Sequence, residues 1–383
     1  IKQYVIDRVS EMADLEDKRT NPGIVFVDDD VASRLESFYR YAVSTLLSID
    51  DSGKTIRDLG IDPHAFKNGR GLIGALAAVG AFCTLTNSNV DHTFELIAYR
   101  PKNRWGSKRQ IDEPSVWDAD ALTYPLVWDT VDHTSGDIIF APHSPDPVLY
   151  GIRGDTTDSI FEAFGMIKSE DCERLTLFLT NQGTDAHLKR ISKISQVKPY
   201  DSVIVRGTVV EKPIILTGGH VILKISDETS TIDCAVYKPT GQLTKIARQL
   251  EPGDLIEVYG GAKITVNSKL TINVEKLAII KLTTIIEQRN PKCPKCGKTM
   301  KSAGRNKGYK CPKCKYQSKN LTKQIAVKPR KILEAIYLPP PRAHRHLTKP
   351  LMRIGREKVK PPKKMIDQWY WSPTISTTAI MDS

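Results

Sequence analysis

The chain has 383 residues, of which 40% are hydrophobic and 26% charged, and its formal net charge is +12. This composition supports roughly two to four domains with hydrophobic cores. No run of about 18 apolar residues occurs, which excludes a membrane-spanning helix, and the chain does not open on the charged-then-apolar pattern of a signal peptide. Because it starts at Ile1, inside what already reads as a structural element, we expect a fragment without its true N-terminus.

The positive charge is concentrated toward the C-terminus. Residues 289–364 contain 24 Lys and Arg against two acidic residues, a local net charge of +22, whereas the rest of the chain has a net charge of −10. Such a block is typical either of phosphate contact or of a disordered, solvated tail. We favour phosphate contact, because the block includes a predicted metal site.

The seven cysteines indicate the compartment. Four are clustered, whereas Cys83, Cys172 and Cys234 stand singly in apolar segments. This pattern suits a reducing cytoplasm with a metal site better than a secreted disulfide framework. We expect a cytoplasmic protein with no membrane contact and no obligate protein partner.

Strand and helix patterns alternate through the N-terminal half, which predicts an α/β or α+β architecture. Asn68-Gly69-Arg70-Gly71 precedes one helix and could bind an anion there, although a lone glycine-rich turn is weak evidence. The predicted elements are a strand at Ile24–Val27, helices at Ala32–Ser48 and Lys67–Phe82, strands at Phe94–Tyr99 and Ile138–Phe140, a helix at Thr157–Met166 and a strand at Leu175–Thr180.

A rigid polar loop is predicted at Pro142–Pro147, because three of its six residues are prolines. It leads into Gly151-Ile152-Arg153-Gly154, whose exposed backbone N–H groups and guanidinium would suit a phosphate. An ordinary Pro/Gly turn explains the same segment.

A second polar segment, Thr180–Leu188, directly follows a predicted strand, which is where open α/β sheets place their ligands. Asp185 could hold Mg²⁺ or orient a hydroxyl, and His187 could move a proton. The alternative is a capped turn, with Asp185 as a helix N-cap.

From Lys198 the pattern changes to short alternating strands. Three strands, a helix and two further strands are the order of an OB-fold barrel, and another small β-barrel is the alternative. Such barrels bind single strands, but also sugars and proteins. The predicted strands are Ser202–Val210, Val221–Ile225, Thr231–Tyr237, Leu255–Tyr259 and Leu270–Leu277, with the helix at Gln242–Leu250.

The sharpest motif is Cys293-Pro-Lys-Cys296 followed, after fourteen residues, by Cys311-Pro-Lys-Cys314. Two such pairs can place four thiolates tetrahedrally around Zn²⁺, whereas coincidence or a redox pair is the alternative. Four sulfur ligands leave no position for water or substrate, so this zinc site is predicted to be structural.

A series of motifs occurs in one order along the chain to about Leu351: Gly69–Ala78, Glu95–Arg100, Trp105-Gly106, the Pro142–Gly154 loop, Thr180–Leu188, Gly218–Val221, the cysteine pairs and Pro339–Leu347. By these motifs the chain resembles the archaeal agmatinylcytidine synthetases that modify the isoleucine tRNA with anticodon CAU.

The resemblance implies an α+β multidomain fold: a kinase-like α/β module with a ferredoxin-like insertion, an OB-fold barrel and a zinc ribbon. It implies that ATP, with Mg²⁺, is cleaved to AMP and pyrophosphate and phosphorylates O2 of the wobble cytidine. The amine of agmatine then displaces this phosphate at C2, and the tRNA reads AUA instead of AUG. Zinc would be structural, and the partners would be the tRNA and agmatine.

The resemblance also implies domain bounds and residue roles. The domains would be 1–66, part of the catalytic region; 67–135, ferredoxin-like; 136–194, the catalytic module; 195–284, the barrel; 285–320, the ribbon; and 321–383, a basic tail. Catalytic roles fall to Asp146, Arg153, Asp185 and His187, nucleotide binding to Gly151, Gly154, Thr180, Asn181, Gln182, Gly183 and Thr184, and agmatine binding to Glu95. Contacts with tRNA fall to Arg206, Lys224, Lys295, Lys298, Arg305, Lys307, Lys310, Arg342 and Arg345.

One departure concerns the ATP site. The family opens on a strand with clustered aspartates, followed by a threonine that becomes phosphorylated, and neither is present here. Asp28–Asp30 stand at the wrong place in the order, and we interpret them as a loop and helix cap. We therefore expect catalysis from a full-length form. One alternative is a non-catalytic RNA- or single-strand-binding protein. Another is a DNA-directed zinc-ribbon factor, which would leave the predicted ligand-binding segments of the N-terminal half without a purpose.

Overall fold

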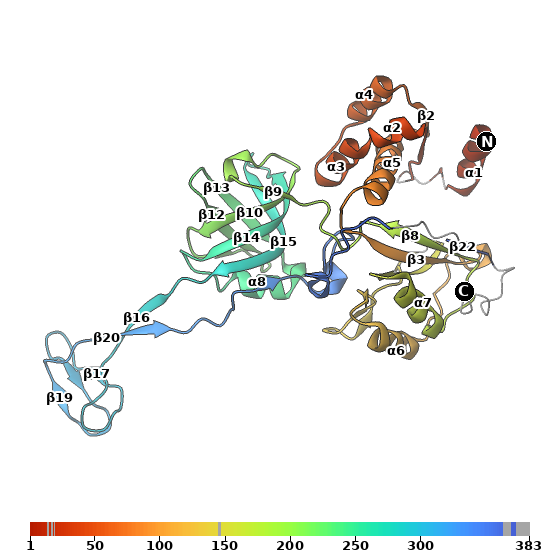
Figure 1. Cartoon of the computed structure of the whole chain (residues 1–383). Helices are drawn as coiled ribbons and strands as arrows, with labels where there is room; N and C mark the ends of the chain where they lie inside the picture. The colour runs from red at the N-terminus through yellow and green to blue at the C-terminus, as the bar shows by residue number, and fades with distance from the viewer. Residues whose placement is uncertain (14, 17, 19, 145–146, 363–368, 373–383) are drawn as a thin grey trace.

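The computed structural model describes residues 1–13, 15–16, 18, 20–144, 147–362 and 369–372. A helical N-terminal module, a ferredoxin-like domain, an OB barrel and a zinc ribbon follow one another along the chain (Figure 1). After the ribbon, the chain returns and passes between the barrel and the ferredoxin-like domain. Within the described residues, no helix combines the length and the apolar character that a membrane crossing requires.

The N-terminal module is built on α5 (Gly71–Asn87), which packs against α3 (Glu36–Ser44). Gly80 permits this approach, because a Cβ there would lie 2.1 Å from the carbonyl oxygen of Leu35. The predicted helix at Ala32–Ser48 is divided, since the chain turns at Arg34 and Leu35 and the Leu35 side chain enters the core. The other elements are α1 (Lys2–Met12), β1 (Gly23–Phe26), α2 (Asp29–Ser33), which starts at the Asp28–Asp30 run as interpreted, α4 (Ile49–Leu59) and β2 (Asp62–Ala65).

The ferredoxin-like domain is an antiparallel sheet with strand order β22-β8-β3-β7-β4, against which α6 (Glu113–Thr123) and α7 (Thr157–Met166) pack. Its chain order β3-α6-β4-β7-α7-β8 is the split βαβ arrangement. The domain boundary expected at residue 135 would cut through this sheet, because β7, which follows that residue, pairs with both β3 and β4, which precede it. Its strands and 3₁₀ helix are β3 (Thr93–Tyr99), η1 (Lys102–Arg104), β4 (Val127–Trp128), β7 (Val148–Gly154), β8 (Arg174–Thr180) and β22 (Tyr370–Trp371), with a separate hairpin of β5 (Val131–Asp132) and β6 (Asp137–Ile138).

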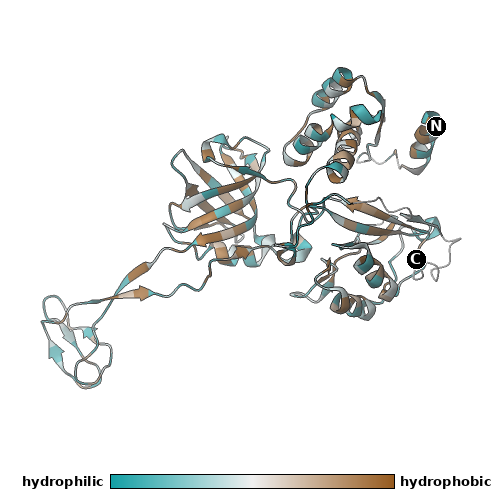
Figure 2. Ribbon diagram, in the orientation of Figure 1, coloured by the Kyte–Doolittle hydropathy of each residue, from teal (hydrophilic) through white to brown (hydrophobic). Residues whose placement is uncertain are grey.

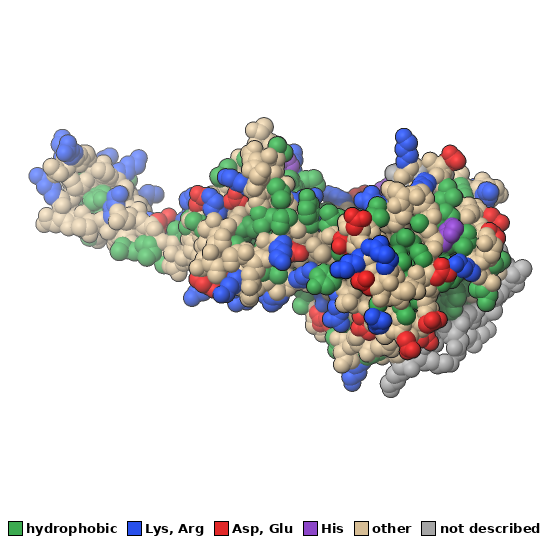
Figure 3. All heavy atoms as spheres, turned by 90° about the horizontal axis from the view of Figure 1, so that it is seen from above, with side chains coloured by type: hydrophobic (Ala, Val, Ile, Leu, Met, Phe, Trp, Pro, Cys, Tyr) green, Lys and Arg blue, Asp and Glu red, His purple; other side chains and the backbone are tan. Residues whose placement is uncertain are grey.

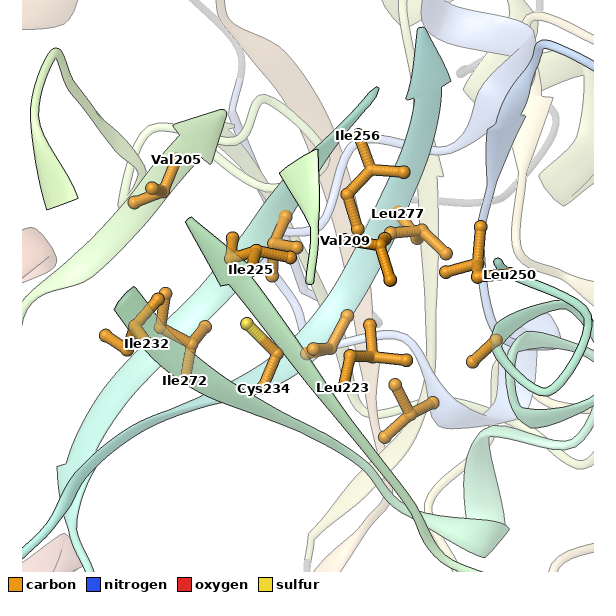
Figure 4. Close-up of a cluster of buried hydrophobic side chains, with 14 of the residues drawn as sticks. Val205, Val209, Leu223, Ile225, Ile232, Cys234, Leu250, Ile256, Ile272 and Leu277 are labelled. Carbon is orange, nitrogen blue, oxygen red and sulfur yellow. The ribbon is translucent and has the colours of Figure 1, made fainter. Parts of the chain in front are cut away.

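The third part is a closed barrel in the order β11-β12-β13-β15-β14-β10, with β12 pairing β10 and β13 running parallel to β15. These pairings confirm the OB-fold prediction. Apolar and polar residues alternate along the strands (Figure 2), and the inward set, including Leu223, Cys234 and Ile272, meets inside the barrel (Figure 4). The elements are β9 (Lys189–Ile191), η2 (Ile194–Gln196), β10 (Ser202–Val209), β11 (Ile214–Ile215), β12 (Val221–Ser226), β13 (Thr231–Val236), η3 (Lys238–Thr240), α8 (Gln242–Ala247), β14 (Leu255–Ile264) and β15 (Leu270–Lys281).

The zinc ribbon stands away from the barrel on two arms, β16 (Ile285–Arg289) and β20 (Gln324–Lys328), which pair with each other (Figure 1). We call residues 339–357, which follow the ribbon, the strap. The basic tail expected at residues 321–383 is not one segment. Its β20 belongs to the arm that returns the chain from the ribbon, whereas the strap packs on other parts of the protein. The remaining elements are β17 (Lys301–Ser302), β18 (Tyr309–Lys310), β19 (Gln317–Ser318), β21 (Ile336–Tyr337), η4 (Pro341–Ala343) and η5 (Leu351–Arg353).

Candidate functional site

A buried carboxylate, Glu95, lies on β3 next to the strap. Its Oε1 accepts a hydrogen bond from Arg153 Nε at 3.1 Å, and its Oε2 accepts one from the side-chain amide of Gln182. Arg153 also contacts Nδ1 of His346 in the strap at 2.8 Å. Burial, and after it the charge of Arg153, lower the pKa of His346, so a neutral ring can accept this bond. The fold thus brings together Glu95, Arg153 and Gln182, which are far apart in the sequence.

The loop after β8 is held by hydrogen bonds of its own side chains. Thr180 Oγ1 lies 2.9 Å from Oγ1 of Thr93, and Asn181 donates to the Tyr39 hydroxyl at 2.8 Å, which ties the loop to the N-terminal module. Thr184 donates to the carbonyl of Asn181 at 2.5 Å. Because these side-chain groups already have partners, a nucleotide at this loop would have to bind through other atoms or replace these bonds.

Gly183 lies against the ring of Trp128, the last residue of β4. Its φ is 64°, and a Cβ there would lie 2.5 Å from Cη2 of the ring. Its carbonyl accepts a hydrogen bond from Arg353 at 2.5 Å. A glycine is needed here for both space and conformation.

Gly183→Ala is therefore expected to lower the free energy of unfolding by roughly 2–4 kcal/mol, from left-handed strain plus overpacking. The matched control is Gly136→Ala, where φ is 80° but nothing lies within 4 Å of the added Cβ. Only strain, about 1–2 kcal/mol, acts in the control. Urea unfolding of both variants measures the difference, and equal losses would contradict the packing argument.

Asp185 and His187 are fastened to strand β15 of the barrel. Asp185 Oδ2 accepts from the buried Lys276 at 2.5 Å, and Oδ1 accepts from the backbone N–H of Lys349 at 2.7 Å. His187 Nε2 lies 2.5 Å from Glu275 Oε1. Burial favours a higher pKa of Glu275, but the hydrogen bond with His187, together with the charges of His187, Arg345 and Lys276, brings the pKa below its ordinary value. The alternative of Asp185 as a helix N-cap is wrong, because its φ is 60° and β9 follows, not a helix.

The proline-rich segment differs from the expectation of exposed backbone N–H groups near a phosphate. Gly151, Arg153 and Gly154 lie within β7, a strand paired on both sides, and the Gly151 N–H donates to the carbonyl of Phe140. Gly154 faces Ile160, whose Cγ1 would be 2.8 Å from an added Cβ. These glycines therefore serve close packing of the sheet. Asp146 lies outside the described residues.

A set of ion pairs that the sequence did not reveal joins the strap to the ferredoxin-like domain. The Arg353 side chain is 0% exposed and lies 2.9 Å from Asp91 Oδ1 and 2.6 Å from Asp155 Oδ1. Arg356 also pairs with Asp155, and Lys349 lies 3.2 Å from Asp91. The opposite net charges of the basic block and the rest of the chain are the one feature of the sequence that points to such pairs. The sequence does not predict which residues pair, because the partners are too far apart for any pattern of spacing to link them.

The predicted tRNA contacts fall into two groups. On the barrel and strap, the cationic side chains have acidic neighbours: Arg206 pairs with Glu257, Lys224 with Glu211, Arg342 lies near Asp132 and Asp137, and Arg345 near Glu275. On the ribbon, Lys295, Lys298, Arg305, Lys307 and Lys310 are all exposed, and blue side chains project around it in Figure 3. Residues 291–320 contain ten Lys and Arg and no acidic residue. The ribbon thus presents the stronger unneutralised charge.

The four thiols of the ribbon fit a zinc ion. The Sγ atoms of Cys293, Cys296, Cys311 and Cys314 all lie within 4.8 Å of one another, as tetrahedral ligation requires. Hydrogen bonds from the backbone N–H groups of Cys314 and then Lys313 help to lower the pKa of Cys311 to about 6, which favours the thiolate. Cys83, Cys172 and Cys234 are free thiols elsewhere in the chain.

The chain matches three family profiles: "TiaS FLD domain" over residues 69–187, "OB-fold nucleic acid binding domain" over 203–280, and "TiaS C-terminal zinc ribbon domain" over 290–332. The isoleucine-tRNA 2-agmatinylcytidine synthetase TiaS of Methanosarcina mazei is 41% identical over 93% of this chain and 82% of its own length. The homologue of Methanocaldococcus jannaschii is 41% identical over 92% and 82%.

Solved structures agree with these relatives. The crystal structure of apo TiaS has a TM-score of 0.81 at 39% identity and covers 91% of this chain and 81% of that chain. The complex of TiaS with its isoleucine tRNA, AMPCPP and agmatine has a TM-score of 0.76 at 38% identity and covers 92% and 82%.

A ferredoxin-like domain, an OB barrel and a four-cysteine ribbon on one chain define a multidomain nucleic-acid-binding protein. The likeness covers more than nine tenths of the chain and runs through all these domains in order. The chain belongs to the TiaS family of isoleucine-tRNA 2-agmatinylcytidine synthetases. The predicted family and the α+β multidomain fold class are thereby confirmed.

Proposed function

We propose that this chain is an ATP-dependent tRNA ligase that joins agmatine to C2 of the wobble cytidine of the CAU-anticodon isoleucine tRNA, so that the tRNA decodes AUA. The observation that carries the proposal is the likeness, in sequence and structure over about nine tenths of the chain, to a protein solved with an isoleucine tRNA, AMPCPP and agmatine. The non-catalytic alternative lacks such support, because the likeness extends well beyond the barrel and the ribbon.

ATP supplies the phosphoryl group that turns O2 of the cytidine into a leaving group. Mg²⁺, which commonly accompanies ATP phosphates, is part of this proposal. We retain the predicted roles of Arg153, Asp185 and His187 near the nucleotide, with one condition. Both Asp185 oxygens are engaged by Lys276 and Lys349, so this carboxylate must exchange a partner before it can contact a metal ion.

The barrel and the ribbon would hold the tRNA. The exposed cations of the ribbon contact phosphates, and Tyr316, whose ring lies 5.3 Å from Nζ of Lys295, is placed to stack on a base. The three cysteines outside the ribbon remain free thiols, which supports a reducing compartment, and we place the protein in the cytoplasm.

The proposal is tested with full-length protein, ATP, Mg²⁺, labelled agmatine and CAU-anticodon isoleucine tRNA. We expect label in the tRNA, with at least one inorganic phosphate released per agmatine attached, because the phosphoryl group taken from ATP leaves with O2 of the cytidine when the amine attacks C2. The matched control is the same tRNA with U in place of C at the wobble position, which offers no cytidine to modify. Salt-sensitive tRNA binding without incorporation by the full-length protein would favour the non-catalytic alternative.

A further inference from the structure

An exposed tryptophan stands among cations on the ferredoxin-like domain. We call residues 101–109, which lie between β3 and α6, the β3–α6 loop. Trp105 in this loop is 42% exposed, and its motif, Trp105-Gly106, has no role in the proposed reaction. Residues 100–111 contain five Lys and Arg and no acidic residue, although the chain outside residues 289–364 has a net charge of −10. An exposed ring among cations is typical of surfaces that bind single-stranded nucleic acid.

A buried ion pair holds the β3–α6 loop in place. Arg100 Nε donates to Glu170 Oε1 at 2.7 Å, and the two side chains are 0% and 1% exposed. Arg100 also donates through Nη1 to the carbonyl of Ser107 and through Nη2 to its hydroxyl, both at 2.9 Å. The ring N–H of Trp105 donates to the carbonyl of Arg100 at 3.0 Å. Because this N–H is the only polar group of an indole, the exposed part of the ring is left for apolar and stacking contacts.

Two lysines of the β3–α6 loop stand without an acidic partner. Lys102 and Lys108 are exposed, and no ion pair among the described residues includes either of them. Arg109, by contrast, is used inside the domain, where it donates to the carbonyls of Val148 and Ser144, each at 2.9 Å. The two lysines therefore retain their charge for an external anion.

The β3–α6 loop lies at the end of the sheet opposite the predicted nucleotide loop. Thr93, the first residue of β3, donates to the carbonyl of Gln182 at 2.8 Å, whereas the β3–α6 loop follows Tyr99, the last residue of the strand. A strand of this length separates its two ends by about 20 Å. The surface is therefore distinct from the residues to which the proposed reaction assigns a role.

We propose that the β3–α6 loop is a second RNA-binding surface, on which Trp105 stacks on an unpaired base of the tRNA and Lys102 and Lys108 contact the adjoining phosphates. This inference rests on the proposed function, which supplies the tRNA as the partner. A base can cover an indole ring only where it is unstacked, so the contacted segment is a loop or an end of the tRNA and not a stem. Phosphate contacts fix the orientation of a bound nucleic acid. Contacts on both the ribbon and this loop therefore restrict the tRNA to one orientation.

The test separates the ring from the charges by measuring tRNA binding to the full-length protein at several salt concentrations. Trp105→Ala is expected to raise the Kd for CAU-anticodon isoleucine tRNA about fivefold or more, the worth of one stacked base, with an unchanged salt dependence. Trp105→Phe loses the same hydrogen bond to Arg100 but keeps a ring, and should retain most of the affinity. An unchanged Kd in Trp105→Ala, or an equal loss in both variants, would overturn the stacking contact.

The double variant Lys102→Gln/Lys108→Gln tests the phosphate contacts. It should raise the Kd and lower the slope of log Kd against log salt concentration by about 1.4, at roughly 0.7 for each phosphate of a single strand. The matched control is Lys54→Gln/Arg57→Gln, which removes two exposed cations from α4, where Asp51 stands one turn away from Lys54. The control should leave both Kd and slope unchanged, and equal slopes in the two double variants would overturn the phosphate contacts.

Folding and catalysis are checked separately. Thermal unfolding of the lysine variants should shift by less than about 2 °C, because both side chains are exposed. If Trp105→Ala fails to fold, the lysine pair decides alone. Weaker tRNA binding by these variants, combined with a wild-type protein that attaches no agmatine, would support the RNA-binding surface and count against the proposed function only.

Discussion

Arg353→Ala is expected to lower the free energy of unfolding by about 3–5 kcal/mol, the usual cost of removing one partner from a buried ion pair. The guanidinium is 0% exposed and pairs with both Asp91 and Asp155, whose side chains are only 11% and 3% exposed. Its loss leaves each carboxylate with one cationic partner, Lys349 for Asp91 and Arg356 for Asp155. The carbonyl of Gly183 loses its donor as well. Thermal unfolding should show the loss as a fall in Tm of roughly 10 °C.

The control for this prediction is Arg40→Ala. Arg40 lies 4.0 Å from Glu36, and its side chain is 61% exposed, so removing it should cost less than about 1 kcal/mol. Arg353→Lys should fall between the two, because one ammonium cannot bond to both carboxylates in the fork geometry of a guanidinium. A Tm for Arg353→Ala equal to that of Arg40→Ala would show that the strap is not fixed by this pair.

Cys311→Ser is expected to release the zinc ion and, with it, most of the tRNA affinity. Structural zinc provides on the order of 10 kcal/mol to a small site, and the sulfur cluster includes two of the few buried residues of the ribbon, Cys293 and Cys311. Without a folded ribbon, the ten Lys and Arg that we propose to contact phosphates are no longer held close together. We expect tRNA to bind at least about tenfold more weakly, with a smaller salt dependence.

Metal analysis, filter binding at several salt concentrations and thermal unfolding check this prediction together. The melting of the barrel should change little, because the described ribbon strands pair with one another and not with barrel strands. Cys172→Ser, which removes a free thiol outside the ribbon, should retain zinc and tRNA affinity. Zinc-free Cys311→Ser protein with unchanged tRNA affinity would move the main tRNA contact away from the ribbon.

The basic block at residues 289–364 has two roles. The part of the block in the ribbon presents exposed cations, whereas Lys349, Arg353 and Arg356 in the strap pair with Asp91 and Asp155 inside the protein. The strap also contacts β15, because the Lys349 carbonyl accepts a hydrogen bond from Lys276. The barrel, which would hold the tRNA, is thereby joined to the ferredoxin-like domain by a segment that contacts both.

Local features were readable from the sequence because they depend on neighbours in the chain. Alternation in Val221–Ile225 predicted a barrel strand, and the Cys293 and Cys311 pairs predicted the thiol cluster, since turn geometry alone places two thiols of each pair. The helix at Thr157–Met166 also begins and ends where its pattern indicated.

Tertiary structure alone decided which distant groups meet. Both carboxylate oxygens of Glu95 accept hydrogen bonds, one from Arg153 and one from Gln182. Those of Asp185 accept from Lys276 and Lys349, so only the fold determines whether either carboxylate is free to bind a ligand. The same holds for Arg353, which is 262 residues from its partner Asp91. Charge composition showed that residues 289–364 and the rest of the chain have opposite net charges. An ion pair, however, depends on the distance between two charged groups in space, and only the fold determines that distance.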